Sequence, residues 1–276
     1  MVEFFQGQPC RRIRIACGDA VLVALQGAHV LSWISSGRER LFLSEANRWD
    51  GHSAIRGGIP VCFPQFNARG SLPKHGFARN LPWQAGVISE EPDHAQLVCT
   101  LAANPDTLAI WPQLFEAQLH IDLRPGQLQV TLSVHNTGQT PLHFSGALHT
   151  YLAVDDIAQA QLIGLGGQPE WDSLADVHAF AAPTLHFGAE FDRVYAAAPS
   201  PLLLQDGAHR LEIAQSPEWA DTVVWNPGQA KGAAMADMQA GGFARMLCVE
   251  AAQVFNPVEV AAAGRWDGWQ RLRVVA

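Results

Sequence analysis

A strict alternation of apolar and polar residues over 116–134 is the feature that most constrains the fold of this chain. Between 116 and 123 every odd position is apolar and every even position polar, and after Pro125-Gly126 the apolar residues fall at 128, 130, 132 and 134. Successive side chains of a strand point to opposite faces, so this pattern predicts two strands, each with one buried and one wetter face. The Pro-Gly pair predicts the turn of a β-hairpin between them.

Other segments of the chain also have the composition of short strands separated by turn residues. They lie at 11–17, 20–26, 28–35, 95–102, 141–151, 201–205, 209–215, 221–226, 245–253 and 270–276. No segment has the period of an amphipathic helix of three turns, which argues against alternating β and α units. The sequence therefore predicts an all-β fold, a large antiparallel β-sandwich or barrel. No composition break, linker or repeat divides the chain, so we expect one domain over 1–276.

Charge and cysteine content narrow the classes of function. The 26 Asp and Glu outnumber the 18 Lys and Arg and give a net charge of −8, which argues against nucleic acid or an anionic membrane as a partner. No segment approaches the roughly 20 apolar residues of a membrane span, and the first residues lack the apolar core of a signal peptide. The five cysteines are scattered and never spaced CxxC, as is typical of reduced thiols. We expect a cytoplasmic protein.

A cationic segment interrupts this acidic chain. From Gly51 to Ser89 there is no Asp or Glu, whereas Arg56, Arg69, Lys74 and Arg79 give a local charge of +4. Such a segment predicts a pocket for one small anion, most plausibly a phosphate, because guanidinium groups bind oxyanions through two parallel hydrogen bonds. Taken singly, each of these side chains could equally be a solvated surface charge.

Two glycine-containing motifs lie within this segment. In RGGIPVCFPQF (56–66), Gly57-Gly58 allows the backbone to approach a ligand closely. In LPKHGFARNLPW (72–83), His75 and Arg79 lie between apolar and aromatic residues, the composition of a small-ligand pocket. The alternatives are a surface loop for the first motif and a structural histidine for His75.

His149 lies in the predicted strand 141–151. On this reading His143, Ser145, His149 and Tyr151 share one face, which would form either a polar cleft floor or a solvated outer face. His143 and His149 are six residues apart, roughly 20 Å along a strand, so they cannot share a metal ion.

Glu250 is the most anomalous carboxylate, because it interrupts MLCVEAA (246–252), a run that is apolar on both faces and predicts a central strand. Burial disfavours a charged carboxylate, so this group must be paired or titrate abnormally, which makes it a candidate general base. The alternative is a structural ion pair. Asp192, in FDRVY, could likewise be a turn or ion-pair residue beside Arg193.

Together these segments resemble the hexose-6-phosphate mutarotases (glucose-6-phosphate 1-epimerases) of the aldose 1-epimerase superfamily. The resemblance runs in the family's order through RGGIPVCFPQF (56–66), PKHGFARNLPW (73–83), ALHTYLAV (147–154), DRVY (192–195), VVWNPG (223–228) and DMQAGGFARMLCVE (237–250). It implies the galactose mutarotase-like supersandwich. It also implies that His149 and Glu250 are catalytic, that Arg56, Lys74, Arg79 and Asp192 bind substrate, and that His75 lies beside the sugar ring. Asn67, Phe191, Gly228 and Lys74 depart from the residues usual at their positions but remove no catalytic group.

The activity implied is interconversion of the α and β anomers of a hexose 6-phosphate, most plausibly glucose 6-phosphate, by a monomer without metal or organic cofactor. One group takes the proton of the anomeric hydroxyl while the other protonates the ring oxygen. Three alternatives remain at this point: an aldose 1-epimerase for free sugars, a glycan hydrolase or lyase, and a sugar-phosphate-binding protein without activity. The first would not need the cationic segment, and a hydrolase would need a pair of carboxylates.

Overall fold

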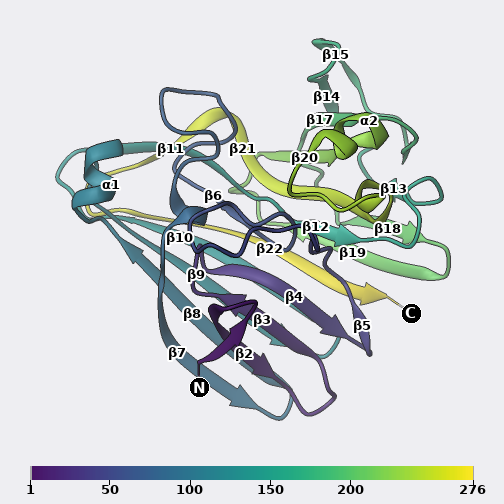
Figure 1. Ribbon diagram of the computed structural model, residues 1–276. Helices are drawn as coiled ribbons and strands as arrows, with labels where there is room; N and C mark the ends of the chain where they lie inside the picture. Colours follow the sequence, from purple (N-terminus) through teal and green to yellow (C-terminus); the bar gives the residue numbers. More distant parts are fainter. Residues whose placement is uncertain (1, 276) are drawn as a thin grey trace.

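The computed structural model describes residues 2–275, with the backbone alone at residue 87, and its regular secondary structure is almost entirely antiparallel β-sheet (Figure 1). An N-terminal five-stranded sheet has its strands in sequence order: β1 (Glu3–Phe5), β2 (Gln8–Arg14), β3 (Ala20–Ala24), β4 (His29–Ser35) and β5 (Arg38–Glu39). The predicted all-β antiparallel fold is confirmed.

A nine-stranded sheet forms the widest layer. Its order is β16 (Thr184–His186), β13 (Gln161–Ile163), β18 (Leu202–Asp206), β19 (His209–Gln215), β22 (Arg265–Val275), β10 (Gln127–Asn136), β9 (Phe115–Arg124), β8 (His94–Ala102) and β7 (Gln84–Glu91). β9 and β10 are the hairpin predicted from the alternation, and Leu123 pairs with Leu128 across it. In β9, every odd position from 115 to 123 is buried, as the period of two requires.

The third sheet carries the site described below. Its order is β15 (Val177–Phe180), β14 (Pro169–Asp172), β17 (Phe191–Ala196), β20 (Asp221–Asn226), β21 (Met246–Val260), β11 (Leu142–Leu148) and β6 (Val61–Cys62), and β12 (Tyr151–Ala153) also pairs with β21. The helices are short: α1 (Pro105–Ile110), α2 (Gly228–Ala234), and the 3₁₀ turns Ala78–Asn80 and Gly242–Arg245. Among the described residues no helix has both the length and the apolar character needed to cross a membrane.

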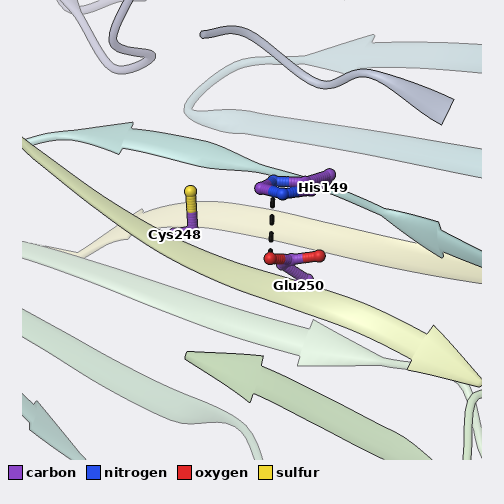
Figure 2. A group of neighbouring side chains, drawn as sticks. All are labelled: His149, Cys248 and Glu250. Carbon is purple, nitrogen blue, oxygen red and sulfur yellow. Dashed lines mark ion pairs between the residues drawn. The ribbon is translucent and has the colours of Figure 1, made fainter. Parts of the chain in front are cut away.

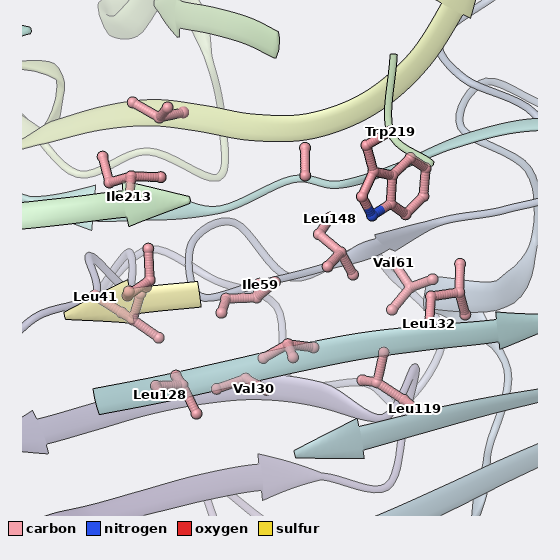
Figure 3. Close-up of a cluster of buried hydrophobic side chains, with 14 of the residues drawn as sticks. Val30, Leu41, Ile59, Val61, Leu119, Leu128, Leu132, Leu148, Ile213 and Trp219 are labelled. Carbon is pink, nitrogen blue, oxygen red and sulfur yellow. The ribbon is translucent and has the colours of Figure 1, made fainter. Parts of the chain in front are cut away.

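All three sheets contribute to one apolar core. Figure 3 shows Val30 of β4, Leu119 of β9 and Leu148 of β11 in the same cluster, and all three are fully buried. Burying one such aliphatic side chain stabilises a fold by about 1.5–3 kcal/mol. The core therefore holds the sheet that carries the site against the other two.

The structure corrects the prediction for one strand and adds short strands that were not predicted. The segment 141–151 is not one strand, because β11 ends at Leu148 and pairing resumes only at Tyr151. A register shift between Phe144 and Gly146 also breaks the alternation, so His143 and His149 do not share a face of one continuous strand. The short strands β12 to β17, with three to six residues each, were not predicted as separate strands.

Candidate active site

A cleft of about 340 Å³ opens over the third sheet. Its floor follows from the strand register. Glu250 of β21 pairs with Val223 of β20, Val223 with Val194 of β17, and Val194 with Trp171 of β14. Because directly paired residues of neighbouring strands point to the same face, these four side chains form one row, and all of them line the cleft.

A second row runs parallel to the first, nearer to α2. Cys248 pairs with Trp225, and Trp225 pairs with Asp192. Trp225 and Asp192 line the cleft, whereas Cys248 is completely buried. Partial burial raises the pKa of the Asp192 carboxyl, with a smaller contribution from Glu190. Thus Asp192 lies on the cleft floor, two strands away from Glu250.

His149 lies above Glu250 because β11 ends one residue before it. The His149 N–H donates to the Pro60 carbonyl at 3.0 Å, which fixes the backbone just after the strand. Its ring stacks on Tyr151, with 4.9 Å between the ring centroids and 10° between the planes. His149 Nδ1 lies 3.4 Å from Glu250 Oε1 (Figure 2). The two side chains that the sequence analysis named as catalytic are therefore neighbours.

Burial determines which groups of this pair are charged. It lowers the pKa of His149 well below its ordinary value, and nearby His75, Arg79 and Arg56 act in the same direction. It raises the pKa of Glu250 well above its ordinary value, assisted by the charge of Asp192. Both shifts favour a neutral imidazole beside a protonated carboxyl group. In that state the one proton that the two groups can exchange lies on Glu250.

His75 closes the cleft on the side of the loop that follows β6. Its ring centroid is 5.5 Å from that of His149, and its Nδ1 accepts a hydrogen bond from the Asn67 N–H at 3.3 Å. A neutral His75 therefore has its proton on Nε2. Burial, together with Arg79 and Lys74, lowers the pKa of His75 to about 3. His75 is thus a neutral hydrogen-bonding group at physiological pH.

The backbone at His75 is held in an unusual conformation. His75 has φ +64° and Gly76 has φ +68°. A Cβ at Gly76 would lie 2.1 Å from the Phe63 carbonyl oxygen, so only glycine fits there. Gly76 is therefore required by the close approach of the loop to the segment that follows β6.

Arg56 lines the cleft but is already neutralised. Its Nη2 donates to Asp237 Oδ2 at 2.9 Å, and its Nη1 donates to the Tyr151 hydroxyl at 2.8 Å. The lack of acidic residues near Arg56 in the sequence therefore did not predict its ion pair, because the partner, Asp237, lies 181 positions later in the chain. Through Tyr151, Arg56 is connected to the His149 ring.

Three cations of the acid-free segment have no such partner. Within the described residues, no carboxylate forms an ion pair with Arg69, Lys74 or Arg79. Arg69 and Lys74 line the cleft. Arg79 does not line it; its Nη2 donates to the Lys74 carbonyl at 3.2 Å, and its Nε is buried without a hydrogen-bond partner.

The structure adds residues that the sequence analysis did not select. Trp171, Trp225 and Lys231 line the cleft, and Lys231 is paired with Glu190. The Arg69 guanidinium lies 5.2 Å from the ring centroids of both Trp171 and Phe255. Trp225 stands within a motif of the resemblance, but Trp171 and Lys231 had no signal in the sequence. His143, by contrast, is exposed, pairs with Glu259 at 3.1 Å and does not line the cleft.

One group of side chains could hold a metal ion. The potential ligand atoms of His149, Cys248 and Glu250 lie within 4.8 Å of one another, and all three residues are buried (Figure 2). Figure 2 shows Cys248 and Glu250 projecting from the same face of β21 towards His149.

Known proteins resemble this chain in sequence and in fold. The family model described as "Aldose 1-epimerase" matches residues 11–273. A relative from Cenchrus ciliaris, provisionally named glucose-6-phosphate 1-epimerase, is 35% identical over 273 residues that cover 94% of this chain and 81% of the relative. The solved structure of a protein from Salmonella typhimurium, provisionally named a mutarotase, has a TM-score of 0.92 and 27% identity, covering 99% of this chain and 92% of that one.

A galactose mutarotase-related enzyme from Lactobacillus acidophilus has a TM-score of 0.77 at 12% identity and covers 97% of both chains, a likeness of fold alone. The galactose mutarotase-like fold expected from the sequence is confirmed.

Proposed function

The chain belongs to the aldose 1-epimerase family, and from this premise we propose that it interconverts the α and β anomers of a hexose 6-phosphate, with glucose 6-phosphate as the first candidate. The name of the relative from Cenchrus ciliaris supports this substrate class. The observation that carries the proposal is the His149–Glu250 pair, 3.4 Å apart at the floor of a cleft whose rim carries cations without partners. An acid and a base are needed together, and this pair supplies both.

The proposed reaction opens and closes the sugar ring. Glu250 takes the proton of the anomeric hydroxyl while His149 gives a proton to the ring oxygen, so the bond between C1 and the ring oxygen breaks and an aldehyde forms. After rotation about the C1–C2 bond, the ring oxygen returns its proton to His149 and Glu250 protonates the carbonyl oxygen. General acid and base groups contribute roughly 10²–10⁴-fold each.

The proton count of the pair matches this cycle. With the closed ring bound, the reactive form is ionised Glu250 beside protonated His149; with the aldehyde bound, it is protonated Glu250 beside neutral His149. Both forms hold one proton. Burial favours the second form in the empty cleft, so binding of the closed sugar must move one proton from Glu250 to the imidazole 3.4 Å away. His75, neutral and with Nε2–H available, is assigned a hydrogen bond to the sugar.

The phosphate is assigned to the cationic rim. Lys74 and Arg69 line the cleft, and neither has a carboxylate partner within the described residues. Arg79 lies outside the lining, but its Nη2 donates to the Lys74 carbonyl and it too has no carboxylate partner there, so it adds positive charge next to the rim. Arg56 has less free charge because Asp237 neutralises it, and we assign it to orienting the substrate together with Tyr151. We assign Asp192, on the cleft floor two strands away from Glu250, to accepting hydrogen bonds from sugar hydroxyls.

We expect the enzyme to act as a monomer. We also expect it to lie in the cytoplasm, in keeping with its five free cysteines.

Anomer-exchange NMR tests the proposal directly. Enzyme is added to glucose 6-phosphate, free glucose and free galactose at equal concentration, and the exchange rates between the two C1–H resonances are compared. We expect faster exchange for the phosphorylated sugar. Equal or faster exchange for a free sugar would assign the protein to the epimerases of free sugars, and binding without exchange would make it a sugar-phosphate-binding protein.

A further inference from the structure

Three side chains with metal-ligand chemistry meet at the catalytic pair, although the proposed reaction uses only two of them. Cys248 and Glu250 alternate on β21 and therefore point to one face, and His149 reaches the same place from the turn after β11 (Figure 2). The sulfur, nitrogen and oxygen atoms lie within 4.8 Å of one another. Cys248 has no part in the acid–base cycle.

The spacing of these atoms suits one small cation. Three atoms that lie within 4.8 Å of one another fit within a circle of radius about 2.8 Å, so a metal ion at its centre is at most about that far from each atom. Zinc binds such ligands at about 2.0–2.3 Å, so each ligand atom must move by only roughly 0.5–0.8 Å. The 3.4 Å between His149 Nδ1 and Glu250 Oε1 already equals the nitrogen–oxygen separation of about 3.3 Å across a tetrahedral zinc ion. A fourth position would remain open towards the cleft that His149 and Glu250 line.

Two of the potential ligand residues have unmet hydrogen-bonding capacity. His149 Nδ1 and Glu250 Oε2 are buried and have no hydrogen-bond partner. A divalent cation bound by one carboxylate and one thiolate forms a neutral complex, which relieves the penalty of burying a charge. The mixture of sulfur, imidazole and carboxylate ligands favours zinc or cadmium over magnesium or calcium.

We propose that a thiophilic divalent cation, represented by Zn²⁺, binds to His149, Cys248 and Glu250 and reversibly blocks the site. On binding, the Cys248 thiol and the Glu250 carboxyl group each release one proton to solvent, and the thiolate sulfur and a carboxylate oxygen bond to the metal; no group is oxidised or reduced. The metal occupies the Nδ1 lone pair and the carboxylate that anomer exchange requires. Substrate and metal therefore exclude each other.

The first measurement needs no turnover. Cd²⁺ is titrated into the metal-free protein, and the ultraviolet charge-transfer absorption of a cadmium–thiolate bond is recorded. We expect one equivalent of Cd²⁺ to produce the band, Zn²⁺ to remove it by competition, and glucose 6-phosphate to oppose its formation. The cadmium titration and the zinc competition test the metal site even if the proposed substrate is wrong, because only the third measurement uses the sugar phosphate.

Variants identify the thiol. Cys248→Ser should abolish the cadmium band and raise the Zn²⁺ concentration for half-inhibition of anomer exchange by at least about 10-fold, each protein being scored against its own metal-free rate. The matched control is Cys62→Ser, which changes another buried thiol that contacts a cleft histidine, with 3.1 Å between Cys62 Sγ and His75 Nδ1. That control should keep both the band and the inhibition.

Two results would overturn the proposal. One is a wild-type protein that gives no cadmium band and keeps its exchange rate at millimolar Zn²⁺. The other is a band or an inhibition that Cys248→Ser leaves unchanged. If Cys248→Ser does not fold, Cys248→Ala replaces it, and the titration of the wild-type protein is decisive by itself.

Discussion

His149 and Glu250 face each other 3.4 Å apart, and neither the histidine Nδ1 nor the second carboxylate oxygen has a hydrogen-bond partner. Both residues line the cleft, so a molecule bound there can supply the hydrogen bonds that buried polar groups require. The pair supports the proposed acid–base cycle, and its members are expected to act as a unit.

The first prediction tests that unit. Glu250→Gln retains the shape of the side chain and removes the base, so anomer exchange should fall by at least about 10²-fold while sugar-phosphate binding survives. His149→Asn should reduce exchange comparably. The double variant should be little slower than either single variant, because the loss of one partner already stops the proton cycle. Fully additive losses in the exchange rates would contradict a paired mechanism.

The second prediction concerns stability against pH. Burial raises the pKa of Glu250, so in the folded protein the carboxyl group keeps its proton at pH values where the unfolded chain loses it. Its contribution to stability is therefore present below the ordinary glutamate pKa and is lost as pH rises through the folded pKa. Glu250→Gln has no such loss, so the melting temperature of this variant, relative to that of the wild type, should rise as the pH increases above the ordinary glutamate pKa.

The control for this experiment is Glu218→Gln, because the Glu218 side chain is exposed and forms no ion pair within the described residues. The difference in melting temperature between this variant and the wild type should not grow over the same pH range. A constant difference for Glu250→Gln would mean that Glu250 is ionised in the folded protein throughout.

The third prediction tests the phosphate site. Arg79 has no carboxylate partner within the described residues, and charge-assisted hydrogen bonds contribute about 1.5–3 kcal/mol. Arg79→Ala should lower kcat/KM for glucose 6-phosphate by roughly 10- to 10²-fold and leave any activity on free glucose nearly unchanged. Lys74→Ala should have a smaller effect of the same kind, because an ammonium group makes no bidentate contact.

The contrary outcome is equally informative. Arg79 also donates to the Lys74 carbonyl at 3.2 Å, next to His75. Equal damage to both substrates would show that Arg79 holds this turn in place, and the assignment of a phosphorylated substrate would lose its main physical support.

The fourth prediction concerns the backbone beside His75. A Cβ at Gly76 would meet the Phe63 carbonyl oxygen at 2.1 Å, whereas one at Gly37, with a similar φ of +72°, would meet nothing within 4 Å. Gly37→Ala should therefore carry only the cost of the left-handed backbone, about 1 kcal/mol. Gly76→Ala should destabilise the protein by clearly more in denaturant unfolding and should slow anomer exchange. Equal destabilisation would show that the loop yields easily around His75.

The sequence was sufficient for the fold class and for the burial of Glu250. Alternation identified the β9–β10 hairpin because its two faces differ sharply in burial. Glu250 stood out because β21 is buried on both faces at that point, which makes a carboxylate conspicuous. Local pattern thus carries information wherever burial is strictly periodic or complete.

Other features depend on contacts between distant parts of the chain. Arg56 meets Asp237, and nothing in the local charge pattern indicates this partner. Trp171 lines the cleft from β14, a strand of four residues whose neighbour β15 is exposed throughout, so that no apolar periodicity marks it. The predicted polar face of 141–151 failed for a related reason, since the irregular pairing of β11 with β21 changes which side chains face the cleft.

The position of β21 in its sheet has a consequence for the order in which this protein becomes active during synthesis. β21 pairs with β20 on one edge and with β11 and β12 on the other. A ribosome completes all three of these partners before it reaches Met246, so in the nascent chain the two halves of the sheet have no strand in common. The strand that joins them also brings Glu250 to His149. A partly synthesised chain therefore lacks the proposed acid–base pair, and the step that completes the sheet also brings its two members together.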